Sequence, residues 1–185
     1  MSECQGRTDE ELMVSAGTGD LDAFEELVRR YQQMAVGLAG RMLGDAHQAQ
    51  DVAQEAFLRV WQGAARYRPT AAFRTYFYRV LTRLCIDHWR RPTPATGEGL
   101  ERAEGPSDPP EEAMLRRERA ERVRTALDRL PRRQRTALVL RHYEGLSYEE
   151  IASVMDCSGR AVDSMLTRAR RRLHGWLSDE SEGID

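Results

Sequence analysis

An all-α fold is predicted for this chain, with two small helical domains joined by a flexible linker. Apolar residues recur at a spacing close to 3.6 along several stretches, which indicates amphipathic helices, and no alternating run of β-branched residues is long enough for a strand. A central segment rich in Pro, Gly and acidic residues nearly lacks large apolar side chains. We therefore predict a first domain over 1–91, a linker over 92–110, a second domain over 111–177 and an acidic, disordered tail over 178–185.

The composition favours an intracellular protein. No run reaches the roughly 18 apolar residues of a membrane span, and the first residues show no signal-peptide pattern, so we expect a cytoplasmic protein without membrane insertion. Cys4, Cys85 and Cys157 are odd in number and far apart, which favours reduced thiols. The net charge is −2, and all 28 basic residues are arginines. Any phosphate contact would therefore be made by a guanidinium group.

The first domain is expected to begin with a short helix opened by the capping box of Thr8 and Glu11. Asp20 can then cap a long helix that ends near Gly44. The next helix, which contains residues 51–61, turns outward an acidic side with an exposed leucine. The residues on that side are Asp51, Gln54, Glu55, Leu58 and Arg59. It is available for a partner protein.

Aromatic residues alternate with arginines between positions 66 and 79, where Pro69 interrupts the helical pattern. Rings that stack on bases, next to guanidinium groups that pair with phosphates, are typical of single-stranded DNA binding. The alternative is that some of these rings are core residues, the candidates being Phe73, Phe77 and Trp89. We expect some of each, with Phe77 buried and with Tyr67 and Tyr76 more accessible.

Two helices are expected at the start of the second domain. Asp108 with Glu111 would cap the first of them, and Pro131 would start the second, which ends before Gly145. Their apolar residues should supply the core for the motif that follows.

The stretch from residue 146 to residue 177 predicts a helix-turn-helix. Ser147 and Glu150 form a capping box for a short helix, and after a tight turn Ser158 can cap a second helix. The inward positions of that second helix are Val162, Leu166, Ala169 and Leu173. Arginines cover its outer side, which fits the DNA major groove. Such a face is often only solvated surface, but the chain as a whole is slightly acidic, so this local cluster favours DNA binding.

Together these motifs resemble the sigma-70 family of bacterial RNA polymerase initiation factors, specifically its extracytoplasmic-function (ECF) group, over residues 23 to about 177. Residues 51–61 resemble the polymerase-binding helix of sigma region 2. Residues 73–79 and 86–91 resemble the part that melts the promoter and reads the −10 element. Residues 130–135, 143–152 and 166–173 resemble region 4, which reads the −35 element.

The resemblance implies a sigma factor that directs promoter-specific transcription initiation, without enzyme activity or a cofactor. Its implied partners are promoter DNA, core RNA polymerase through the β′ clamp coiled coil and the β subunit, and an anti-sigma factor of the kind usual in the family. Polymerase binding is assigned to Asp51, Gln54, Glu55 and Leu58. Binding and melting of the −10 element are assigned to Arg66, Tyr67, Arg68, Phe73, Arg74, Tyr76, Arg79, Arg83 and Arg90. Binding of the −35 element is assigned to Ser158, Arg160, Ala161, Ser164, Thr167, Arg168, Arg171 and Arg172.

Roles within these sets follow from position. The loop over 66–72 is implied to help capture a base flipped out of the non-template strand. Base reading in the duplex is assigned to the first turns of the last helix, at Arg160, Ala161 and Ser164. Phosphate positioning is assigned to Arg168, Arg171 and Arg172.

Two other functions fit part of the pattern. An ordinary helix-turn-helix regulator that binds an operator as a dimer would explain the second domain, but it leaves the acidic helix face and the aromatic-arginine segment without a task. A thiol hydrolase would use Cys85 and His88, which lie three apart on one helix without an evident third group or oxyanion donors. The remaining histidines indicate no metal set, because His47, His142 and His174 are scattered.

Overall fold

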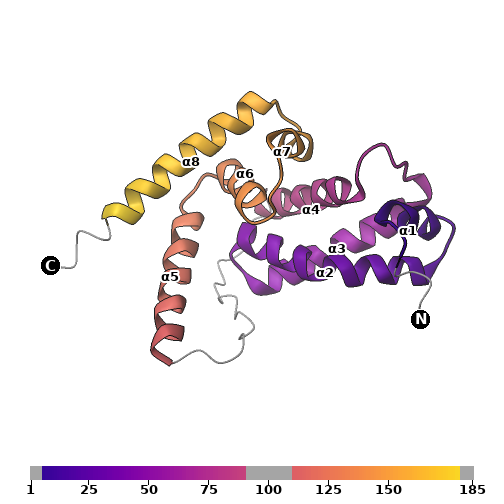
Figure 1. Ribbon diagram of the computed structural model, residues 1–185, viewed down its shortest axis with the longest axis horizontal. Coiled ribbons are helices and arrows are strands. Elements are labelled where there is room, and N and C mark those ends of the chain that lie inside the picture. Colours follow the sequence, from indigo (N-terminus) through magenta and orange to yellow (C-terminus); the bar gives the residue numbers. More distant parts are fainter. Residues whose placement is uncertain (1–5, 91–109, 180–185) are drawn as a thin grey trace.

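The computed structural model describes residues 6–90 and 110–179, and within these two ranges it contains helices and no strand (Figure 1). The predicted all-α class is confirmed. The elements are α1 (Asp9–Ala16), α2 (Leu21–Leu43), α3 (Ala46–Gly63), the 3-10 helix η1 (Ala64–Arg66), α4 (Phe73–Arg90), α5 (Pro110–Asp128), α6 (Arg132–His142), α7 (Tyr148–Met155) and α8 (Gly159–Asp179). None of the described helices is long and apolar enough to cross a membrane.

Helices α1 to α4 form the first body, and their ends follow the predicted capping chemistry. The Asp20 carboxylate accepts from the Ala23 N–H at 3.0 Å, so α2 starts where expected. At its other end Gly44 has φ 79°, a left-handed conformation that glycine adopts without strain. The apolar stripe of α2 is buried against α3 and α4. The predicted helix over Asp20 to Gly44 is confirmed.

An ionic cluster ties α1 to α2. Asp9 pairs with Arg30 at 2.7 Å and accepts a hydrogen bond from the Tyr31 hydroxyl. Glu26 accepts two hydrogen bonds from Arg29, at 2.6 and 2.8 Å, and one from Arg30 at 2.7 Å. These hydrogen bonds, with Arg29 the larger contributor, lower the pKa of Glu26 to about 2.

Replacing Glu26 by glutamine is expected to destabilise the protein at neutral pH. A carboxyl whose folded pKa lies below its unfolded value stabilises the fold above the unfolded pKa, and this contribution is lost as pH falls toward the folded pKa. The gap in unfolding free energy between wild type and Glu26→Gln should therefore be largest above about pH 4.5 and shrink toward pH 2. Urea unfolding across this pH range measures it, with exposed Glu25→Gln as the control. A gap independent of pH would contradict the assignment.

Helices α5 to α8 form the second body, in which α7 and α8 make the predicted helix-turn-helix. The reciprocal capping box of Ser147 and Glu150 is present at the start of α7. Asp156, at φ 52°, ends α7 in a left-handed conformation, and the Ser158 hydroxyl accepts from the Ala161 N–H at 3.2 Å at the start of α8. The inward positions Val162, Leu166 and Ala169 are fully buried. The motif is confirmed.

One predicted boundary lies outside the described residues, and another differs from the structure. Asp108, predicted as a cap, lies outside the described residues, as does most of the predicted linker. The tail was expected from residue 178, but α8 continues through Asp179. The helix continues because Trp176 extends the apolar stripe of α8 by three residues beyond Leu173, and both side chains pack against the core.

The two bodies are packed against each other. Helix α7 lies against α4, α6 lies against α2, and buried residues of both bodies belong to one continuous core. Arg135 of α6 stabilises this contact between the bodies. Its buried side chain pairs with Asp128 at 2.8 Å and donates to the carbonyls of Met42 at 2.7 Å and Leu127 at 2.8 Å. The bodies that the sequence placed on a flexible tether are therefore in direct contact.

Candidate nucleic-acid interface

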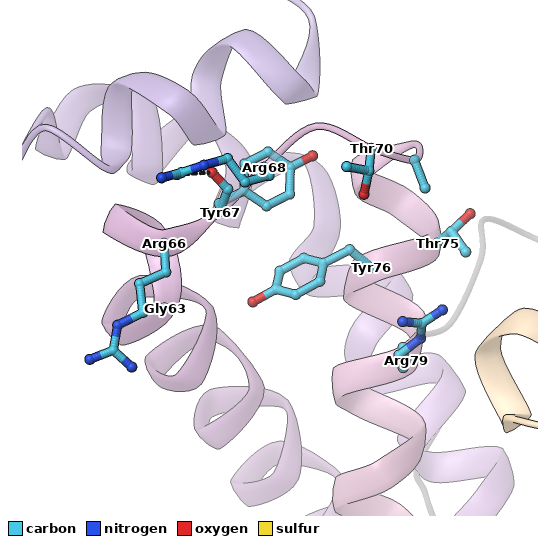
Figure 2. Close-up of a pocket in the computed structure, with 9 residues that line it drawn as sticks. Gly63, Arg66, Tyr67, Arg68, Thr70, Thr75, Tyr76 and Arg79 are labelled. Carbon is cyan, nitrogen blue, oxygen red and sulfur yellow. Dashed lines mark hydrogen bonds between the residues drawn. The ribbon is translucent and has the colours of Figure 1, made fainter.

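A pocket of about 310 Å³ opens between η1 and the start of α4 (Figure 2). Two tyrosines of the aromatic-arginine segment, Tyr67 and Tyr76, line it together with three arginines of the same segment. The lining residues are Gly63, Arg66, Tyr67, Arg68, Thr70, Ala71, Thr75, Tyr76 and Arg79. Thr70 and Ala71 belong to the loop over 66–72 that was predicted to capture a base, Thr75 lies within the predicted −10 segment over 73–79, and Gly63 lies outside both. An aromatic wall with cations at its rim suits a base whose phosphate stays outside.

Helix α1 holds the wall of this pocket in place. The Glu10 carboxylate accepts from the Phe73 N–H at 2.7 Å, so a residue 63 positions away caps the N-terminus of α4. At the end of α1, a Cβ on Gly17 would lie 2.7 Å from the Ala64 carbonyl oxygen, so only glycine allows this close approach to η1. Sequence reasoning missed Glu10, because no local pattern indicates a cap supplied from so far along the chain.

The two tyrosines of the pocket lie close together. The Tyr67 and Tyr76 ring centroids are 5.5 Å apart with an interplanar angle of 56°, and both side chains are half-buried, as predicted. Burial raises the pKa of both phenols, so both stay neutral at physiological pH. The Tyr67 hydroxyl is buried without a hydrogen-bond partner among the described residues. Buried hydroxyls without a partner are uncommon in proteins.

The prediction that Phe73 contacts DNA is corrected. Its side chain is 1% exposed, because the ring packs against Tyr31 at 5.2 Å and Phe77 at 6.0 Å between centroids. It also lies 6.2 Å from the Tyr76 ring. Phe73 therefore supports the pocket from behind and has no free face for a base. Phe77 is buried, as predicted.

The remaining arginines of the −10 set divide into two groups. Arg66, Arg68, Arg83 and Arg90 are exposed along the loop and α4. The other two reach the second body. Arg74 donates to the Glu144 carbonyl at 2.6 Å, and Arg79 donates to the Ser153 hydroxyl at 2.8 Å. In this arrangement, called closed below because the two bodies are in contact, Arg74 and Arg79 of the predicted −10 surface are bonded to the second body.

The predicted −35 face lies on α8. Six of its eight residues are exposed, namely Ser158, Arg160, Thr167, Arg168, Arg171 and Arg172. The other two, Ala161 and Ser164, are half-buried at the side of the helix. Arg170 is also exposed and adds a cation that the sequence analysis had not assigned. Because the opposite stripe is sealed in the core, α8 presents one polar, arginine-rich side to its surroundings.

The acidic side of α3 is also open. Asp51 and Gln54 are exposed, and Leu58 is 55% exposed, which is high for a leucine in the middle of a helix. Glu55 is half-exposed and pairs with Arg59 at 2.9 Å. A carboxylate patch around one apolar side chain fits a basic, partly apolar protein surface.

No thiol nucleophile forms at Cys85. Its side chain is fully buried, and burial raises the pKa of the thiol to about 12. No hydrogen bond joins His88 to the Cys85 thiol among the described residues, and the His88 Nε2 lies 2.8 Å from Oε1 of Gln48 on α3. Cys85 and His88 are therefore packing residues.

A helix-turn-helix with an arginine-rich face, a pocket lined by tyrosines and arginines, and an exposed acidic helix side are together typical of a DNA-binding protein. Comparison with known proteins identifies the family. The sigma-70 region 2 model matches residues 27–93, and the sigma-70 region 4 model matches residues 120–173. The chain belongs to the sigma-70 family, as a factor of the ECF type.

Its relatives match along most of their length. The RNA polymerase sigma-H factor of Pseudomonas aeruginosa is 40% identical, over 89% of this chain and 91% of the relative. The ECF sigma-E factor of Escherichia coli is 34% identical, over 90% and 92%. Among solved structures, CnrH in complex with the cytosolic domain of CnrY aligns with TM-score 0.71 and 26% identity, over 92% of this chain and 97% of that chain.

Proposed function

We propose that this sigma factor binds core RNA polymerase in the cell interior and directs it to promoters by reading −35 duplex with α8 and a melted −10 strand with the pocket between η1 and α4. The observation that carries the proposal is that one chain has both an exposed arginine-rich side on α8 and a separate pocket lined by tyrosines and arginines. An operator-binding dimer would use α8 alone and leave both the pocket and the acidic side of α3 unused. The protein acts by binding, without catalysing a reaction itself.

The pocket has the contents needed to hold a flipped base. Flipping costs a few kcal/mol, and stacking on an aromatic ring is worth about 1–3 kcal/mol per base. The Tyr67 hydroxyl, buried without a partner among the described residues, would add a hydrogen bond to a base edge. Arg66 and Arg68, exposed at the rim, would pair with the flanking phosphates. Binding energy of this size roughly balances the cost of flipping one base. Melting would be driven by binding energy within the polymerase complex, without nucleotide hydrolysis.

The α8 face is assigned to the −35 duplex. Arg160 lies in the first turn of α8, where a recognition helix reaches base edges. Arg171 lies three turns later, where it would meet the backbone. Both side chains are exposed in the closed protein, so this surface is accessible before polymerase binds.

The acidic side of α3 is assigned to the β′ clamp coiled coil of core polymerase, and Glu55→Arg tests the assignment. Reversing one charge in a complementary interface should weaken core binding by about tenfold or more, since like charges placed together cost more than a kcal/mol. Fluorescence titration of labelled protein with core enzyme measures the affinity. Secondary structure should be unchanged, because Glu55 is half-exposed and its pairing with Arg59 is local.

Glu118→Arg is the matched control. It makes the same change of charge at an exposed position on α5, outside the three assigned surfaces. If Glu55→Arg bound core polymerase as tightly as Glu118→Arg, the acidic side of α3 would not be the contact.

A further inference from the structure

Glu144, in the turn between α6 and α7, reaches into the first body. Its side chain is only 8% exposed. One carboxylate oxygen accepts from the Tyr78 hydroxyl at 2.8 Å, and the other lies 3.4 Å from Nη1 of Arg41. Its backbone carbonyl accepts from Nη2 of Arg74 at 2.6 Å. Two guanidinium groups and one hydroxyl, all from α2 and α4, thus converge on an anionic residue of the second body.

The three donors are held in place by their neighbours. The Arg74 guanidinium also donates to the Tyr78 hydroxyl at 3.0 Å and lies over its ring, 5.2 Å from the centroid. Arg41 folds back over Gly37, where an added Cβ would come within 3.1 Å of its Nη1. Burial raises the pKa of Tyr78 to about 12, so its hydroxyl keeps its proton and can donate. The set is built to bind an anion with two or more oxygens.

We infer that Arg41, Arg74 and Tyr78 form a binding site for a backbone phosphate of promoter DNA, and that Glu144 occupies it in the closed, free protein. This inference rests on the proposed function, since it adds a contact to the −10 surface. Neither Arg41 nor Tyr78 belonged to the predicted set. Arg74 did belong to that set. Arg79, which follows Tyr78 in the sequence, likewise donates a hydrogen bond to Ser153 of the second body. Separation of the two bodies would replace the Glu144 carboxylate at Arg41 and Tyr78, and the Glu144 backbone carbonyl at Arg74, by a phosphate.

The Arg41–Glu144 ion pair itself should exchange readily. Arg41 is 38% exposed, so solvent and a competing anion can reach it. Ion pairs that remain open to water are weak. A DNA phosphate carries its charge on oxygens that the same guanidinium groups can bind, and the second body would then be released from α4.

The test compares two variants that remove one negative charge each, Glu144→Gln and Glu149→Gln. Glu149 lies five residues away, in the first turn of α7, and is exposed. Fluorescence anisotropy with a short fluorescein-labelled oligothymidylate reports binding of the free, full-length protein. Glu144→Gln should bind at least about threefold more tightly than Glu149→Gln, because a larger fraction of the protein has the phosphate site open. Both variants keep the α8 arginines, so binding there contributes equally.

A second arm identifies the site itself. In the Glu144→Gln background, Arg41→Ala should weaken oligothymidylate binding and reduce the slope of log affinity against log salt by about 0.7, the value for one phosphate contact on a single strand. Equal affinities for Glu144→Gln and Glu149→Gln, or an unchanged slope after Arg41→Ala, would overturn the inference. Wild-type protein that still directs core polymerase to start sites would then leave the proposed function standing. Circular dichroism verifies that every variant is folded.

Discussion

Replacing Tyr76 by alanine should slow the formation of open promoter complexes by about 5- to 150-fold. Its ring lines the pocket beside Tyr67, and loss of one base–aromatic stack costs about 1–3 kcal/mol. The loss should appear only after the strand opens, because the ring meets a base that has left the duplex. Permanganate footprinting of thymines over time, with core polymerase present, measures the opening rate directly.

Tyr76→Phe serves as the control for this prediction. It keeps the ring and removes the hydroxyl, so it should open promoters at nearly the wild-type rate. The half-buried position means that Tyr76→Ala also loses some packing, and an unchanged affinity of the variant for core polymerase, which the first body is assigned to bind through α3, verifies that this body is intact. An opening rate that is normal for Tyr76→Ala, or equally reduced for Tyr76→Phe, would remove stacking on this ring from the mechanism.

Replacing Arg160 or Arg171 of α8 by alanine should change −35 DNA binding in two different ways. Arg160→Ala is expected to cost about 1–3 kcal/mol on the preferred −35 sequence and to relax the preference at one base pair, because Arg160 lies in the first turn. Arg171→Ala is expected to weaken all sequences by a similar factor and to lower the salt dependence by about one counterion, because it contacts phosphate.

Competition binding on a panel of single-base −35 variants distinguishes these outcomes. Both residues are exposed and neither packs in the core, so each variant serves as the control for the folding of the other. If Arg160→Ala lost the same factor on every member of the panel, Arg160 would be a phosphate contact and the base reading would have to come from elsewhere on α8.

Local signals in the sequence predicted much of this molecule. The capping boxes at Thr8 and Ser147 and the Asp20 cap mark helix starts that the structure contains, because each depends on residues three positions apart. The alternation of buried and exposed positions in α8 was also predicted from local spacing, because it repeats about every 3.6 residues, the length of one helical turn. Spacing alone also predicted that Leu58 faces outward.

Contacts made across long sequence separations were not predictable. Glu10 caps α4 from α1, and Glu144 reaches three residues of the other body; neither pairing leaves a pattern in neighbouring residues. The same limit explains Phe73. The resemblance assigned Phe73 to −10 binding and the aromatic pattern left a core position open, because which aromatic ring turns inward depends on how α2 and α4 pack. Composition likewise indicated a tether between two bodies but gave no sign of the Arg135 contacts that close them.

The central claim is that this chain redirects core RNA polymerase to specific promoters. The most direct measurement is in vitro transcription with purified core enzyme on a library of genomic fragments, followed by mapping of the transcript 5′ ends. We expect a limited set of start sites that share one −10 and one −35 sequence and that disappear when the chain is omitted. Transcripts that start at random positions, or no transcripts above those of core enzyme alone, would contradict it.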